Sequence, residues 1–224
     1  MNVDGWVLPD EVRAIFAEKK HTLVPIIAGS NANEWTTLGG LDRSQYPKTI
    51  EEYRKRVEAQ YREAVKDYDA AYPVKSEADI PEALLGVGRD TTFTLEMRTW
   101  ARLVTAAGQK AFLYQFTRVP PSPSAKTWGA YHAAEIPYVF ETLRVRDWPF
   151  TEVDFTLSDR MSSYWVNFAT TGDPNGGGLP KWSPYDQASE PYLELGDTVQ
   201  TKNHLLKTQL DFLEQLQRRR QTSQ

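Results

Sequence analysis

The spacing of hydrophobic residues along the chain predicts both strands and helices. Residues 23–28 (LVPIIA) are apolar at every position and too few for a helix, a pattern typical of a strand buried on both faces of a parallel sheet. The aromatic alternation of residues 110–119 (KAFLYQFTRV) predicts a second strand, and residues 192–195 predict a short third one. Because helical segments separate these strands, the pattern indicates an α/β fold.

Helices are predicted where apolar residues recur at spacings of three and four. We expect them over residues 11–19, 49–68, 90–107 and 158–172, with Ser158 capping the last of these and Gly172 ending it. Residues 71–90 hold two prolines and two glycines and are expected to form a loop with a short helical piece. A final amphipathic helix is predicted from Leu205, Leu206, Phe212, Leu213 and Leu216.

Composition excludes several classes of function. The 224 residues carry a net charge of −4, so a basic surface for nucleic acid is not expected. The basic run at residues 218–220 is expected to complement the dipole of the last helix. The sequence has no cysteine, which excludes disulfides, thiolate metal sites and a cysteine nucleophile.

The chain also lacks the signals of membrane insertion and of metal binding. No segment approaches 18 consecutive apolar residues, and residues 1–16 do not read as a signal peptide, so localisation stays open. The sequence has no cysteine, and its three histidines do not form a cluster. Neither a metal nor another cofactor is therefore expected.

One of the three histidines is a candidate for a functional role because of its neighbours in the sequence. His132 lies in the segment GAYHAAEIPYVF, between small residues that allow close approach by another group. A histidine among apolar neighbours is more often an ordinary core residue than a catalyst. However, it follows a predicted strand, and α/β proteins place their sites in loops at the carboxyl ends of parallel strands.

A catalytic histidine needs a group that orients its ring. Glu34 follows the first predicted strand in the segment GSNANEW and would lie at the same edge of the sheet. Its carboxylate could accept from one ring nitrogen and hold the tautomer. The alternative is an acid at a helix start that interacts with the helix dipole, and position alone does not separate the two.

Three segments together resemble a known family. VPIIAGSNANEWT, GAYHAAEIPYVF and MSSYWVNFATTGDPNGGGLPKWSPY are similar, in this order, to the C-terminal signatures of the type-B carboxylesterases, a branch of the α/β-hydrolase fold. The resemblance runs from VDGWVLP onward. It implies that residues 1–224 are a C-terminal fragment of that domain, with a few parallel strands, flanking helices and an incomplete sheet.

The resemblance also implies an activity. Members of this family hydrolyse carboxylic esters through a Ser–His–Glu triad, in which the acid corresponds to Glu34 and the base to His132. The implied substrate is a small-molecule carboxylic ester, and secretion or a periplasmic location would fit the family. No nucleic acid, membrane or cofactor is implied.

The sequence departs from the family at the nucleophile. The sequence contains no G-x-S-x-G pattern. The glycine-rich segment that supplies oxyanion donors is also missing. Ser30 and Ser122 to Ser124 are not expected to replace the strained elbow. We therefore expect the chain alone to be inactive and to need the N-terminal half of the fold. A truncated non-catalytic fragment, or a binding module of the same fold, is the alternative.

The remaining conspicuous residues are expected to be structural. Glu135 should hydrogen-bond buried groups, and Tyr138 and Phe140 should be core residues beside the site. Trp35 should pack over its loop, with lining of the substrate gorge as the alternative.

A fragment of a larger sheet should also leave one edge of the sheet open and expose apolar surface. The residues expected to lose part of their cover are Ile26, Ile27, Phe112 and Tyr114.

Overall fold

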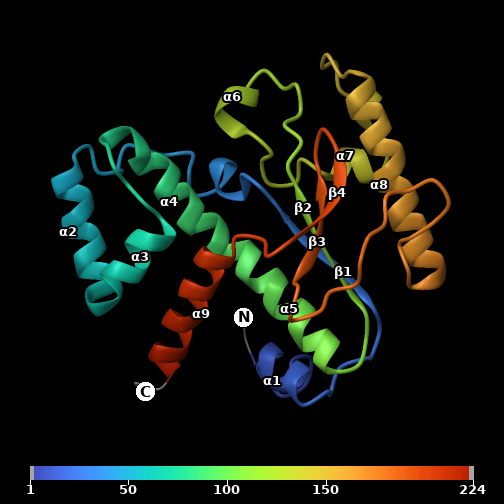
Figure 1. Ribbon diagram of the computed structural model, residues 1–224, viewed down its shortest axis with the longest axis horizontal. Helices are drawn as coiled ribbons and strands as arrows, with labels where there is room; N and C mark the ends of the chain where they lie inside the picture. The colour runs from blue at the N-terminus through green and yellow to red at the C-terminus, as the bar shows by residue number, and fades with distance from the viewer. Residues whose placement is uncertain (1–2, 222–224) are drawn as a thin grey trace.

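The computed structural model describes residues 3–221, and Figure 1 shows a sheet with helices on both faces and a helical lobe beside it. The strands are β1 (Ile26–Asn31), β2 (Ala111–Phe116), β3 (Pro191–Leu195) and β4 (Val199–Asn203). The helices are α1 (Val12–Ala17), α2 (Ile50–Tyr61), α3 (Val65–Ala71), α4 (Ile80–Arg89), α5 (Leu95–Ala106), α6 (Ala125–Trp128), α7 (Ile136–Val139), α8 (Glu152–Thr171) and α9 (Lys207–Gln221).

The sheet has four strands in the order β1-β2-β3-β4. The first three are parallel, with Ile26 opposite Ala111 and Asn31 opposite Phe116, and β4 runs antiparallel to β3. Strand β4 was not predicted, because its residues are mostly polar and exposed and give no hydrophobic alternation. The third strand was predicted at residues 192–195 and is found there with one residue added.

Successive residues of β2 pack against opposite layers of helices. Phe112 and Phe116 belong to the core that α8 covers with Leu157 and Met161. The intervening Leu113 lies in a second core, on the α5 side of the sheet. The predicted α/β class, with a mainly parallel sheet between flanking helices, is confirmed (Figure 1).

Strand β1 is an edge strand. In the described part of the chain it pairs with β2 alone, so the predicted open edge is confirmed. Ile26, Ile27 and Tyr114 are half-buried as expected, but Phe112 is fully buried because α8 and Trp182 cover it. The partial exposure is therefore found at β1 and at Tyr114, which lies opposite Gly29 of β1, and not at Phe112.

The first strand begins later than predicted. Leu23 and Val24 are exposed (45% and 50%), and the ladder starts where the Ile26 N–H donates to the Lys110 carbonyl. Pro25 has no N–H to contribute to a ladder, so pairing starts at the residue that follows it.

The helical lobe departs from the prediction at two points. The helix expected over residues 49–68 stops at Tyr61, because Arg62 adopts a positive φ of 48° and α3 then starts in a new direction. The segment expected to be mainly loop, residues 71–90, contains α4, which continues through a π-helical turn (Asp90–Thr94) into α5. Its Pro81 lies in the first turn, where a missing N–H costs nothing.

Helix α8 has its N-cap seven residues before the predicted one. Thr151 is its N-cap and forms a capping box with Asp154, whereas Ser158 lies inside the helix and donates to the Tyr138 carbonyl. Gly172, at φ 75°, ends the helix as predicted. Tyr138 is buried, but Phe140 is 70% exposed and is not the core residue expected.

The last helix, α9, is fastened to α5 and to the lobe. Arg98, only 2% exposed, donates to Asp211 at 2.7 Å, and Arg102 donates to Glu214 at 2.6 Å. Phe212 packs among tyrosines of α2 and α3. The predicted basic residues occupy the last turn of α9.

Candidate active site

The two predicted site residues follow neighbouring parallel strands. Glu34 begins a 3-10 turn (Glu34–Thr37) just after β1, and His132 lies in the loop between α6 and α7, downstream of β2. Because β1 and β2 are parallel and paired to their last residues, both loops leave the sheet at the carboxyl ends of these strands. The fold thus brings together two residues that are 98 positions apart.

The two side chains are in direct contact. His132 Nδ1 lies 2.6 Å from Glu34 Oε2, and Glu34 Oε1 accepts from the Asn31 backbone N–H at 2.7 Å. The Glu34 side chain is almost buried (6% exposed), whereas that of His132 is 44% exposed. An ionised Glu34 therefore holds the proton on Nδ1 and leaves Nε2 as the ring's acceptor.

Opposing influences act on the Glu34 carboxyl. Burial is the strongest and raises its pKa above the ordinary value, and the nearby Glu135 adds to this. The Asn31 N–H and the His132 ring favour the ionised form and lower the pKa, without cancelling the effect of burial. The two hydrogen-bond partners thus stabilise the ionised carboxylate, although burial still raises its pKa on balance.

The acid loop is joined to the backbone of the base loop by three hydrogen bonds, two of which involve side chains of the acid loop. Asn33 donates its N–H to the Ala130 carbonyl at 3.0 Å, and its side-chain oxygen accepts from the Ala130 N–H at 2.9 Å. Thr36 Oγ1 donates to the Trp128 carbonyl at 2.7 Å. These bonds fix the loops against each other on one side of the Glu34–His132 pair.

A second set of bonds ties the other side of the histidine loop to β1. The Asn31 amide donates to the Tyr131 carbonyl at 2.8 Å and to the Glu135 carboxylate at 2.5 Å. The prediction that Glu135 hydrogen-bonds a buried group is confirmed, since Asn31 is buried. His132 thus sits between two anchored neighbours, Tyr131 and Glu135.

An aromatic ring flanks the histidine from a third element. Phe93, in the π-helical turn before α5, lies with its ring centroid 5.1 Å from that of His132, at 37° between planes. Sequence reasoning missed Phe93, Asn31 and Asn33. The polar run SNANE after a buried strand was a usable signal for the two asparagines, but nothing in the sequence marks Phe93.

Two of the serines near the site in the sequence, Ser30 and Ser122, are buried. Ser30 is 2% exposed and its hydroxyl donates to Thr94 at 3.3 Å. Ser122 is 8% exposed, and its Oγ has no hydrogen-bond partner in the described residues. No hydrogen bond between a serine and the His132 ring is found within residues 3–221.

Trp35 packs over its loop as expected. A Cβ added to Gly39 or Gly88 would lie 2.3 or 2.4 Å from the indole, so the ring fits between two glycines. It thereby fastens the loop after Glu34 to α4.

The described residues provide neither a metal-binding cluster nor a membrane-spanning helix. Within residues 3–221 no group of three or more histidine, aspartate or glutamate side chains could hold a metal ion. No helix in that range is long and apolar enough to cross a membrane.

Comparison with known proteins identifies the same architecture. The family described as "Carboxylesterase family" matches residues 1–213. Carboxylesterase 5A of Felis catus is 31% identical over 228 residues, covering 94% of this chain and 41% of its own length. Carboxylesterase 1D of Rattus norvegicus is 32% identical over 230 residues, covering 96% and 40%.

A solved structure shares the fold. The protein titled "PNB esterase" superposes with a TM-score of 0.71 at 21% identity, over 94% of this chain and 42% of its own. The chain thus spans about two fifths of the length of the proteins it matches.

Proposed function

This chain belongs to the carboxylesterase family, and on that premise we propose that Glu34 and His132 are the acid and the base of an ester-hydrolysing site. The observation that supports the proposal is the 2.6 Å contact between His132 Nδ1 and the buried Glu34 carboxylate, on an imidazole that remains partly open to solvent. A histidine with one nitrogen held by an acid and the other free is arranged for proton transfer.

In the proposed reaction His132 carries the protons. Nε2 accepts the proton of a serine hydroxyl as that oxygen attacks the ester carbonyl, and it then gives the proton to the departing alkoxide, which leaves as the alcohol. In a second cycle Nε2 takes a proton from water as the water oxygen attacks the acyl carbonyl, and it returns that proton to the serine oxygen as the bond to serine breaks and the acid is released. Glu34 stays ionised and stabilises the imidazolium in both cycles.

We assign the serine and the oxyanion donors to polypeptide outside these 224 residues. The absence of a G-x-S-x-G pattern from the sequence supports this, as does the coverage of about two fifths of the relatives. The open edge of β1 offers the added polypeptide a place to extend the sheet. The substrate class that we propose is a small-molecule carboxylic ester.

A chimera tests the catalytic roles. This chain replaces the corresponding two fifths of rat Carboxylesterase 1D, and hydrolysis of p-nitrophenyl acetate is followed. His132→Ala should lower kcat by about 10⁴–10⁶-fold and Glu34→Gln by about 10⁴-fold. A folded, active chimera that tolerates His132→Ala would refute the proposal.

Two measurements on the chain itself complete the test. The NMR signal of the His132 Nδ1 proton should lie far downfield and should move upfield in Glu34→Gln, because the charged acceptor is lost. The chain alone should not turn over the nitrophenyl ester. Turnover that vanishes in His132→Ala would show that the serine lies within these residues after all.

A further inference from the structure

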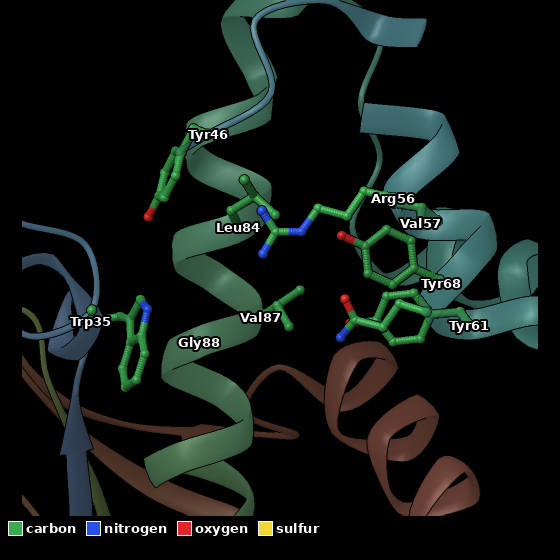
Figure 2. A pocket seen from close by; sticks show the side chains of 11 residues that line it. Trp35, Tyr46, Arg56, Val57, Tyr61, Tyr68, Leu84, Val87 and Gly88 are labelled. Atoms are coloured by element: carbon green, nitrogen blue, oxygen red, sulfur yellow. The ribbon is translucent and has the colours of Figure 1, made fainter. Parts of the chain in front are cut away.

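A cavity of about 300 Å³ lies between α2, α4 and the loop after β1. Figure 2 shows side chains from all three elements facing it. Neither Glu34 nor His132 lines it, so it is a separate feature from the acid–base pair. Its volume is at the lower end of the range of small-molecule sites, enough for a ligand of about one ring.

Most of the wall is apolar or aromatic. Leu84 and Val87 of α4 face Val57 and Tyr61 of α2. Trp35 closes the side nearest β1, held in place by the glycines that flank its ring. The cavity therefore presents preformed surface for an apolar group.

A single charge enters this cavity. The Arg56 side chain extends from α2 toward Leu84, as Figure 2 shows, and no aspartate or glutamate is among the lining residues. In the described part of the chain no hydrogen bond or ion pair is made by the Arg56 guanidinium. Arg56 is exposed, whereas Arg54, two positions away, is paired with Asp69.

Other donors in the cavity also lack acceptors. Within residues 3–221 neither the Tyr46 hydroxyl nor the Trp35 indole N–H has a hydrogen-bond partner. The Tyr61 hydroxyl accepts from the Gln60 amide at 3.1 Å, which leaves its own proton available. Burial raises the pKa of Tyr46 against the charges of Arg43 and, more weakly, Arg56, and it raises the pKa of Tyr61 against those of Arg220 and Arg56, so both hydroxyls remain neutral donors.

From these observations we propose that the cavity binds a small organic monocarboxylate with an apolar body. The carboxylate pairs with the planar guanidinium of Arg56, which matches it with two parallel N–H donors. The body lies on Leu84, Val87 and Trp35. A cation meets no acceptor charge here, a neutral ligand leaves Arg56 unpaired, and a dianion exceeds the single positive charge of the lining.

The proposal is independent of the ester-hydrolysing function, because it uses neither Glu34 nor His132. Phenylacetate is the probe, titrated into the full chain by calorimetry and followed by the NMR signal of the Trp35 indole N–H, which is assigned with Trp35→Phe. A one-to-one complex with a dissociation constant of about 1 mM is expected for a ligand of this size. Phenylacetamide, which lacks the charge, and acetate, which lacks the body, should each bind at least about tenfold more weakly.

A matched pair of variants locates the carboxylate. Arg56→Gln should weaken phenylacetate about tenfold or more, while Lys55→Gln, which removes the same charge from the adjacent exposed position, should leave the affinity unchanged. Far-UV circular dichroism should be the same for both variants, since both side chains are on the surface. Equal affinities in Arg56→Gln and Lys55→Gln, equal binding of phenylacetamide, or an unmoved Trp35 signal would each overturn the proposal.

Discussion

The carboxylate of Glu34 and the imidazole of His132 meet at 2.6 Å although 98 residues separate them in the sequence. Two parallel strands bring their loops to the same edge of the sheet, and Asn33 then fixes one loop to the other through the Ala130 backbone. The alignment of the pair therefore depends on the loop backbones as much as on the two side chains.

Gly129 is a test of that dependence. It adopts φ 61°, and a Cβ there would lie 2.2 Å from Asn33 Oδ1. Gly129→Ala should displace the histidine loop and lower the free energy of unfolding by about 1–3 kcal/mol, measured by urea denaturation. In the chimera kcat should fall by about 10²-fold, because a small misplacement of a catalytic group has a large effect.

The control for this variant is Gly177→Ala, where an added Cβ meets nothing within 4 Å and φ is not in the left-handed region. It should leave both stability and kcat nearly unchanged. Equal behaviour of the two variants would mean that Asn33 does not position the histidine loop.

Asp154 should make stability depend on pH. It is fully buried; although burial opposes ionisation, Arg118, the Thr151 N–H and Tyr138 together lower its pKa below the ordinary value. Because the folded state binds this proton more weakly than the unfolded state, the stabilisation is present above about pH 4 and is lost as pH falls through the lowered pKa. Asp154→Asn should cost about 3 kcal/mol at pH 7, and the difference from the parent chain should shrink in acid.

Asp197 is the matched control, because it pairs with the same Arg118 but its side chain is 77% exposed. Asp197→Asn should change the free energy of unfolding by less than about 1 kcal/mol at any pH. Urea titrations at several pH values measure both variants. An Asp154→Asn effect that is constant with pH would contradict the assignment.

Two glycines of α4 should respond in opposite ways to the same substitution. A Cβ at Gly88 would lie 2.4 Å from the Trp35 ring, whereas one at Gly86 would make ordinary contact at 3.5 Å with Tyr72. Gly88→Ala should lower the free energy of unfolding by about 1–3 kcal/mol through overpacking. Gly86→Ala should raise it by about 0.5–1 kcal/mol, because alanine favours the helix. Thermal melts that rank the two in reverse would contradict the packing of Trp35 on α4.

Phe140 should promote self-association of the chain and should contribute little to its folding stability. It is 70% exposed beside α7, and the nearby Val145 is 83% exposed. Phe140→Ser should change the free energy of unfolding by less than about 0.5 kcal/mol while lowering ANS fluorescence and self-association. Phe116→Ser, at a fully buried position, should instead unfold the chain. A large loss of stability in Phe140→Ser would show that the ring is covered.

The sequence was most informative where a recognisable strand pattern directly preceded a candidate site residue. The uniform apolar run before Glu34 and the alternation before His132 predicted two parallel strands, and the proximity of the two residues followed from that geometry. The predictions that failed involve tertiary context. Strand β4 is held by pairing with β3 although its own residues are polar, and Gly86 and Gly88 resemble helix breakers until Tyr72 and Trp35 are seen to pack on them.

The outer edge of β1 sets a requirement on whatever joins it. Alternate residues of a strand direct their backbone groups to each side, so the six residues Ile26–Asn31 offer an added strand a few hydrogen bonds, each worth about 0.5–1.5 kcal/mol net. That sum falls short of the entropy lost when two separate chains associate. Stable association with another polypeptide would therefore need apolar contacts on the sheet faces around Ile26 and Ile27. These half-buried isoleucines, more than the unpaired backbone amides, would determine how tightly that polypeptide is held.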